Sequence, residues 1–134
     1  MEKFVLGKDI PVMYVTADSF PDGIMGAHHT MHSIVPDRGR SFYGISFPNK
    51  KGEIVYKAGV EQFFEHEALA LGLETYIIRK GNYKSIVLKD YFKQPSLIAK
   101  AFQTLLASKD LDSNGACVEM YLGERDVRCM IRLL

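Results

Sequence analysis

The segment KDLDSNGACVEMYLG (residues 109–123) contains two patterns that could do chemistry. Its first half spells D-x-D-x-N-G from Asp110, which is how a calcium-binding loop begins. Such a loop needs a bidentate Glu at its twelfth position, and here that position is Tyr121. Asp, Ser, Asn and Gly are typical of tight turns, because they bond their own backbone and tolerate positive φ. The pattern therefore predicts a turn and no metal site.

The second half of the segment, CVEMYL, alternates like a strand and carries one carboxylate, Glu119. With GERD as the following turn, Glu119 is expected opposite Met130, and Tyr121 opposite Arg128. This register allows two interpretations. In the first, Glu119 forms an exposed ion pair with Arg128 or Arg132, its diagonal neighbours across the hairpin. In the second, Glu119, Tyr121 and Met130 face a ligand-binding cleft.

Three histidines in HHTMH, at positions 28, 29 and 32, form the other group of potential metal ligands. His28 and His32 are four residues apart, a spacing that can chelate zinc on a helix. A zinc-protease helix would also need a Glu after its first His and a third ligand, and the segment offers neither. We therefore expect His28 to pack on an apolar stripe, with His29 and His32 facing solvent. A polar contact from His28 or His32 to a ligand is the alternative.

Hydrophobic periodicity predicts the elements that must position these residues. In the first part of the chain, strands are expected at 10–17, 40–47 and 53–60, a helix at 21–35, and a short helix at 61–72 that ends at Gly72. In the second part, the runs ETYIIRK and YKSIVLKD flank a turn at Gly81-Asn82, a helix follows at 95–108, and strands at 117–122 and 127–134 form the last hairpin.

The order strand–helix–strand–strand thus occurs twice. YVTADSF (14–20) aligns with IVLKDYF (86–92), and PDGIMGAHHT (21–30) aligns with PSLIAKAFQT (95–104). Two such units would assemble around a pseudo-twofold axis and leave a cleft at their junction. We expect an α+β fold with an antiparallel sheet and helices packed on it. The chain is expected to form one domain, 1–134, with repeat halves at about 1–60 and 73–134 and a helical connector at about 61–72.

The sequence resembles the GyrI-like or AraC-type effector-binding domains, whose fold is a tandem strand–helix–strand–strand repeat. The residues that carry the resemblance are KDIPVMYVTADSFPDGIMGAHHTMHSIVP, SFYGISFPNKKGEIVYKAGVE, ETYIIRKGNYKSIVLKDY, IAKAFQTLL and SNGACVEMYL with DVRCMIRLL. The resemblance implies a free-standing bacterial member that binds a small amphipathic, possibly cationic molecule, as in multidrug-responsive transcription regulation. Members of this family place a carboxylate low in an aromatic pocket, and by position that residue is Glu119.

The expected ligand-binding set combines Glu119 with aromatic and polar wall residues. Tyr43 is included because its strand corresponds, in the first repeat, to the strand of Glu119. The full set is Glu119, Tyr43, Tyr121, Phe102, Tyr83 and His28. Two alternatives to a binding protein stay open. One is a hydrolase of reactive small molecules with Glu119 as general base, and the other is a protein-interaction module of the gyrase-inhibitor type.

Composition and charge exclude several classes of partner. The chain has 134 residues, a formal net charge of +1 and dispersed basic residues, so it lacks the electrostatic footprint for nucleic acid or an anionic membrane. Because no helix-turn-helix is expected, a regulatory role would need a separate DNA-binding regulator, and gyrase is the other protein partner considered. No motif for a phosphate or dinucleotide cofactor occurs, so no cofactor is expected.

The compartment is expected to be the cytoplasm. The N-terminus shows no signal peptide, and no apolar run approaches the ~20 residues of a membrane span. The two cysteines, Cys117 and Cys129, are expected to be free thiols on opposite faces of their hairpin.

Overall fold

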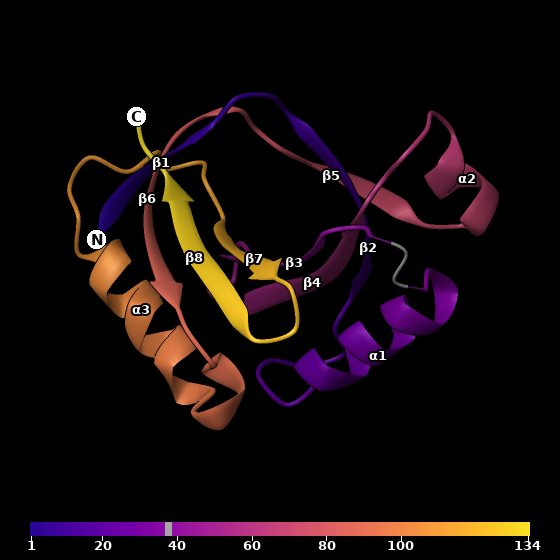
Figure 1. Cartoon of the computed structure of the whole chain (residues 1–134), viewed down its shortest axis with the longest axis horizontal. Coiled ribbons are helices and arrows are strands. Elements are labelled where there is room, and N and C mark those ends of the chain that lie inside the picture. Colours follow the sequence, from indigo (N-terminus) through magenta and orange to yellow (C-terminus); the bar gives the residue numbers. More distant parts are fainter. Residues whose placement is uncertain (37–38) are drawn as a thin grey trace.

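The computed structural model describes residues 1–36 and 39–134, and it arranges eight strands in one antiparallel sheet with helices packed on it (Figure 1). The strands are β1 (Glu2–Leu6), β2 (Ile10–Thr16), β3 (Phe42–Pro48), β4 (Ile54–Glu61), β5 (Glu74–Ile78), β6 (Gly81–Leu88), β7 (Cys117–Leu122) and β8 (Asp126–Arg132). The helices are α1 (Ile24–Ile34), α2 (Glu67–Leu71) and α3 (Ser96–Leu106), with a short 3-10 helix, η1 (Tyr91–Lys93), before α3.

The strand order, β1-β6-β8-β7-β3-β4-β2-β5, has the pseudo-twofold symmetry predicted from the sequence. The units β2–α1–β3–β4 and β6–α3–β7–β8 occupy equivalent halves of the sheet, and β3 pairs with β7 at the centre. The α+β fold with a tandem strand–helix–strand–strand repeat is therefore confirmed. One strand, β1, was missed, and it shows that the halves exchange strands: β1 pairs with β6, and β5 pairs with β2.

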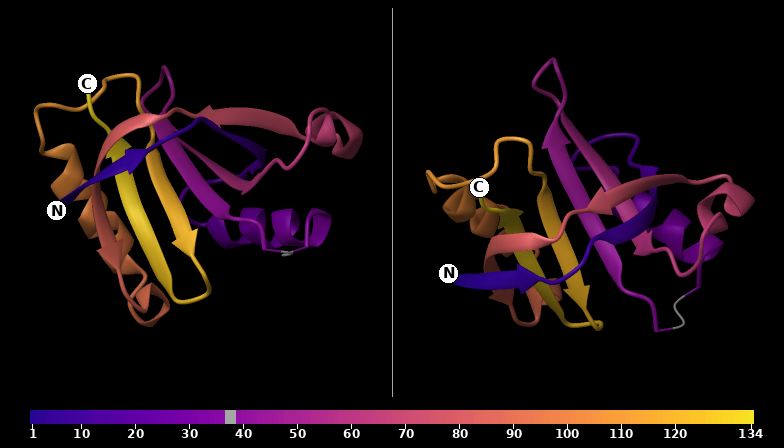
Figure 2. Two further views of the ribbon diagram at one scale, coloured as in Figure 1. Left: turned by 45° about the horizontal axis from the view of Figure 1, so that its top comes forward. Right: turned by 90° about the horizontal axis from the view of Figure 1, so that it is seen from above.

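This exchange explains why β5 and β6 are not partners. The predicted turn at Gly81-Asn82 was wrong, because both residues belong to strand β6. Strand β5 pairs with β2, whereas β6 pairs with β1 and β8. Figure 2 shows the chain passing from β5 to β6 across the molecule, from the side of α2 to the side of α3. Gly81, at the start of β6, has a φ of 139°, which favours a residue without a side chain.

The β7–β8 hairpin has a three-residue turn in place of the predicted four-residue turn. Leu122 pairs with Asp126, and Gly123 in the turn has a φ of 70°, which glycine adopts without strain. The predicted register was therefore wrong by one residue, and Glu119 lies opposite Cys129 rather than Met130. Because side chains alternate along a strand, this shift exchanges the two faces of β8 relative to Glu119.

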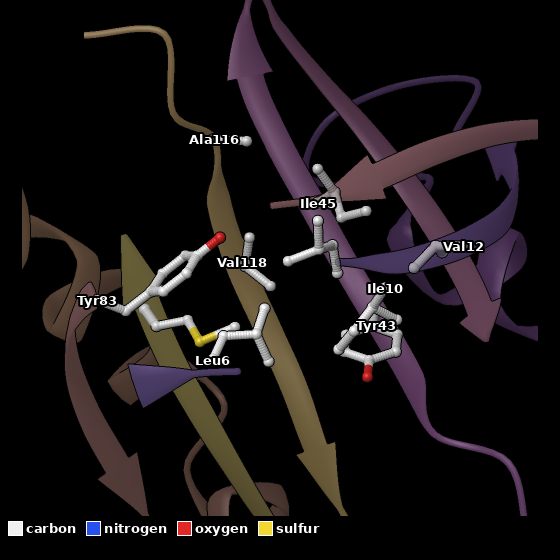
Figure 3. Packing of buried hydrophobic residues seen from close by; sticks show 10 residues of the cluster. Leu6, Ile10, Val12, Tyr43, Ile45, Tyr83, Ala116 and Val118 are labelled. Carbon is white, nitrogen blue, oxygen red and sulfur yellow. The ribbon is translucent and has the colours of Figure 1, made fainter. Parts of the chain in front are cut away.

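The sheet separates two groups of buried side chains. On the face without helices, the sheet curls around a core that includes Tyr43, Ile45, Tyr83 and Val118 (Figure 3). On the other face, α1 and α3 pack against the two halves of the sheet (Figures 1 and 2). Alternating strand residues therefore have two different environments, and the site described below uses only the face that carries the helices.

Each long helix contributes an apolar stripe to this second face. In α3, Ala101, Phe102 and Leu105 are buried, and in α1, Ala27 and Met31 are buried. Burying one large aliphatic side chain of this kind stabilises the fold by about 1.5–3 kcal/mol. The stripes pack both helices against the sheet, and Phe102 together with neighbouring residues of both helices lines a cavity.

Candidate ligand-binding site

A cavity of about 1450 Å³ lies on the helix-bearing face of the sheet. Residues of α1 and α3 form its walls, and residues of β3 and β7 form its base. The lining is mostly apolar and aromatic, and it includes Glu119, Tyr121, Phe102 and His28. A concave apolar site with a few convergent polar groups is the usual form of a small-molecule site.

Glu119 is the buried carboxylate at the base of this cavity, with 7% of its surface exposed. Its Oε1 atom accepts two hydrogen bonds, from the Tyr56 hydroxyl at 2.9 Å and from the Tyr121 hydroxyl at 2.5 Å. No described residue donates a hydrogen bond to Oε2. The carboxylate is thus oriented by two phenols and keeps one oxygen for a further partner.

The pKa of Glu119 is raised above the ordinary value of 4.5 because burial disfavours its charged form. The hydrogen bonds from Tyr121 and Tyr56 act in the opposite direction, since they stabilise the carboxylate. Burial is the larger effect. A cation bound beside Glu119 would favour the charged form of the carboxyl group and so lower this pKa.

The ion-pair interpretation of Glu119 was wrong. Arg128 lies on the opposite face of the sheet, where its Nη1 donates to Glu2 Oε1 at 2.5 Å and to Ser85 Oγ at 2.9 Å. Arg132 pairs with Asp112 at 3.0 Å. No cationic side chain within residues 1–36 and 39–134 forms an ion pair with Glu119. The physical reason is the one-residue change of register, which turns the arginines of β8 away from the cavity.

A hydrogen-bonded chain connects Glu119 to helix α1. The Tyr56 hydroxyl, which donates to Glu119, also lies 2.7 Å from His28 Nε2. Because the Tyr56 proton is used toward the carboxylate, the Tyr56 oxygen must accept the proton on His28 Nε2. Burial and the neighbouring His32 lower the pKa of His28 to about 4, so the ring is neutral at neutral pH. The chain therefore joins α1, β4 and β7 in one polar network.

Gly44 makes this network possible. It lies directly opposite Glu119 in the β3–β7 pair, at the centre of the pseudo-twofold arrangement. A Cβ atom at position 44 would lie 2.7 Å from Glu119 Oε1 and 2.8 Å from Tyr56 Cζ, closer than atoms pack. The missing side chain gives the Tyr56 phenol room to reach across β3, so the first repeat supplies a hydrogen-bond donor to a carboxylate of the second.

Aromatic rings surround this polar group. The Tyr121 ring packs edge-on against His28 at a centroid distance of 5.4 Å, and it contacts Tyr91 at 5.6 Å. His32, which also lines the cavity, stacks on Phe42 at 4.0 Å. Aromatic faces carry partial negative charge and attract cations. The aromatic walls and the carboxylate therefore both favour a positively charged ligand.

Four of the six residues expected to bind a ligand line this cavity, namely Glu119, Tyr121, Phe102 and His28. Tyr43 and Tyr83 lie in the core on the opposite face of the sheet (Figure 3). Tyr43 pairs with Met120, and it is Gly44 that lies opposite Glu119. The two strands correspond as predicted, but alternation directs Tyr43 to the other face. The Tyr83 hydroxyl donates to the Arg79 carbonyl oxygen at 2.5 Å.

Three residues that shape the site are not in the expected ligand-binding set: Tyr56, Tyr91 and Gly44. Tyr56 is in a predicted strand, but nothing in its local pattern shows that its hydroxyl reaches a carboxylate 63 residues away. Tyr91 lies in η1, outside the predicted elements. A glycine inside the apolar strand FYGISF was the one available indication, because glycine in a strand often marks a close approach.

The D-x-D-x-N-G segment forms a turn. Asp112 Oδ1 accepts the Asn114 backbone N–H at 2.9 Å, and Asp110 pairs with Lys84 at 3.0 Å. Among the described residues, no group of three or more His, Cys, Asp or Glu side chains is placed to hold a metal ion. The carboxylates of this segment are used by the turn and by ion pairs.

The two cysteines are free thiols, as predicted, but their expected placement on opposite faces was wrong. Both lie on the helix-bearing face, where Cys117 packs beside the cluster that contains Cys129. Burial raises the pKa of Cys117 to about 11 and that of Cys129 to about 12, so both stay protonated and unreactive at neutral pH.

Comparisons with known proteins identify the fold but no family. No family model matches the sequence, and no curated protein sequence matches it. A crystal structure from the mobile metagenome of Vibrio cholerae, integron cassette protein VCH_CASS2, superposes with a TM-score of 0.70 at 9% identity, over 99% of this chain and 95% of the other. The structure of SAV2435 bound to tetraphenylphosphonium superposes with a TM-score of 0.68 at 9% identity, over 99% and 93%. The chain therefore shares its fold with both proteins.

None of the helices in the described parts of the chain is long and apolar enough to span a membrane.

Proposed function

We propose that this protein binds an amphipathic organic cation in the cavity between α1 and α3, with Glu119 as the charge partner. The observation that carries the proposal is a buried carboxylate at the base of an aromatic cavity, hydrogen-bonded by two phenols and in no ion pair with a described residue. At about 4 Å and an effective dielectric constant of about 20, two opposite charges attract by roughly 4 kcal/mol, part of which is offset by desolvation.

The fold comparison supports the same class of ligand. SAV2435 was solved with tetraphenylphosphonium, an apolar cation without hydrogen-bond donors. A ligand of that kind is recognised by aromatic faces and by an opposite charge, both of which this cavity provides. Tyr121, Phe102, His28 and Tyr91 are the wall residues that would contact it.

We also propose that the protein is a GyrI-like effector sensor of a bacterial cell. The resemblance of the sequence to that family supports this role. In this role, a separate DNA-binding protein responds to the ligand-bound state, because the printed sequence predicts no helix-turn-helix. Binding of such a partner only when the ligand is present would support the sensor role.

A second function, hydrolysis of a reactive small molecule, has one observation in its favour. Glu119 has a raised pKa and hydrogen bonds to two phenols, and a carboxylate of higher pKa is a stronger general base. Incubating each ligand that binds and searching for product by mass spectrometry tests this function. Product that forms equally with Glu119→Gln would exclude Glu119 as the base.

Calorimetric titration with tetraphenylphosphonium tests the binding proposal. Glu119→Gln keeps the shape and the Oε1 acceptor but removes the charge, and we expect it to weaken binding at least tenfold. Glu53→Gln, an exposed carboxylate of the β3–β4 turn, removes the same charge from the surface and should leave affinity unchanged. Equal affinities of the wild type and Glu119→Gln would refute the role of Glu119.

A further inference from the structure

The cavity is an elongated groove that follows helix α3. Residues at successive turns of α3 line it, from Pro95 through Ile98 and Phe102 to Leu106. The helix has 11 residues, so at 1.5 Å per residue this wall is about 16 Å long. Residues of α1 line the groove in the same manner, at Ile24, His28 and His32. A compact cation would fill only part of such a groove.

The charges of the described lining residues leave one place for an ionic head. Within residues 1–36 and 39–134, three side chains with a formal charge line the groove: Glu119, Arg40 and Glu124. Arg40 is already compensated, because its Nη2 atom lies 2.7 Å from Glu67 Oε2. Glu124 is exposed to solvent, so water screens its charge. Glu119 is thus the one buried carboxylate of the described lining, and most of the remaining surface is apolar.

Exposed apolar side chains continue the groove beyond its buried base. Met25 in α1 is 84% exposed, Leu106 at the end of α3 is 56% exposed, and Phe92 in η1 is 50% exposed, and all three line the groove. Exposed apolar residues that gather beside a cavity indicate a surface that something apolar covers. The cavity volume of about 1450 Å³ also exceeds the roughly 300–1,000 Å³ of typical small-molecule sites.

We propose that the ligand is a single-headed cationic amphiphile with a long, flexible apolar chain. Its head lies at Glu119, and its single chain follows the apolar wall to the exposed apolar residues at one end of the groove. This inference rests on the proposed function, because it uses Glu119 as the partner of the head. It adds the length of the ligand and the residues that contact the tail.

A series of n-alkyltrimethylammonium ions with butyl, octyl and dodecyl chains tests the proposal. Titrations below the micelle concentration give the affinity, and displacement of tetraphenylphosphonium shows that the ions occupy the same cavity. We expect affinity to rise up to about fourfold per buried methylene, the fold-change that corresponds to about 0.8 kcal/mol. The increase should stop once the chain is longer than the groove.

Two variants at the edge of the groove locate the tail. Leu106→Ser, at the end of α3, and Met25→Ser, at the start of α1, change exposed side chains, so folding should be unaffected. The variant at the end of the groove that holds the tail should weaken binding of the dodecyl ion severalfold while butyl binding stays the same. Leu69→Ser is the matched control, because Leu69 is 78% exposed and lies in α2, outside the lining of the groove. It should change neither affinity.

Affinity that does not increase with chain length would overturn the inference, as would an increase that persists unchanged in both edge variants. If tetraphenylphosphonium binds through Glu119 but chain length has no effect, the inference fails and the proposed function stands. If neither the alkylammonium ions nor tetraphenylphosphonium bind, both fail.

Discussion

Gly44 lies directly opposite Glu119 in the central β3–β7 pair, and a Cβ atom at position 44 would lie only 2.7 Å from Glu119 Oε1. The two residues occupy corresponding strands of the two repeats. One repeat has the carboxylate, and the other has an empty space through which Tyr56 reaches that carboxylate. The pseudo-twofold fold has therefore produced an asymmetric site from two similar halves.

The first prediction concerns Gly44→Ala. The added methyl group must displace the Tyr56 phenol or the Glu119 carboxylate, and overpacking of this kind costs about 1–3 kcal/mol of unfolding free energy. Urea unfolding measures the cost. Gly26→Ala is the control, because a Cβ there meets no atom within 4 Å, and alanine in helix α1 should stabilise the protein. Equal stability of Gly44→Ala and the wild type would contradict the packing described for Gly44.

The second prediction concerns Tyr56→Phe, which removes one donor to Glu119 and the hydrogen-bond partner of His28 Nε2. Because the lost bond stabilises the carboxylate, the pKa of Glu119 should rise further. The pH at which cation affinity is half lost on acidification should therefore shift upward. Tyr14→Phe, which removes a phenol bonded to the exposed Glu74, should leave that midpoint in place.

The third prediction concerns stability and pH. The pKa of Glu119 is raised above 4.5, so between that value and the folded-state pKa the folded protein holds a proton that the unfolded chain has released. In this window the unfolding free energy of the wild type should fall with rising pH, by up to about 1.4 kcal/mol per pH unit relative to Glu119→Gln. Paired urea titrations across the window measure the difference. A difference that stays constant or grows in favour of the wild type would contradict the burial of a chargeable group.

The fourth prediction concerns the ion pair between Arg40 and Glu67. Both side chains are largely buried, and Glu67 also accepts the Phe63 backbone N–H at 2.8 Å. Arg40→Met would leave a buried carboxylate without its cation and should cost at least about 2 kcal/mol of unfolding free energy. Lys89→Met, which removes the more exposed pair with Asp126, should have a much smaller effect. Similar losses for the two variants would show that burial does not distinguish these pairs.

The sequence predicted most of the fold because the repeat is a local pattern. Helix α3 and strand β7 lie within the predicted ranges, and the faces of β7 follow from simple alternation. Strand β1 could not be predicted in the same way. Its five residues carry little periodic signal, and its partner, β6, lies about 80 residues further along the chain. The exchange of β1 and β5 between the two halves depends on contacts between residues far apart in the sequence, which local patterns do not show.

The site was predicted in part, for an equally specific reason. Glu119 and Tyr121 were placed correctly because they share a face of one strand, whatever the partner strand does. The arginine alternative depended on the turn length, and a turn shorter by one residue removed it. Tyr43 lies on the other face of the sheet, because correspondence between strands does not specify which residue lies opposite which. The role of Tyr56 could not be predicted, because it depends on the close approach of its phenol to Gly44. Only the three-dimensional arrangement shows this approach.

The most direct test of the central claim compares tetraphenylphosphonium with tetraphenylborate, ions of nearly the same shape and opposite charge. If the uncompensated carboxylate of Glu119 selects the ligand, the wild-type protein should bind the phosphonium at least tenfold more tightly than the borate in calorimetric titrations at neutral pH. The preference should largely disappear in Glu119→Gln. Equal binding of the two ions by the wild type would contradict the account.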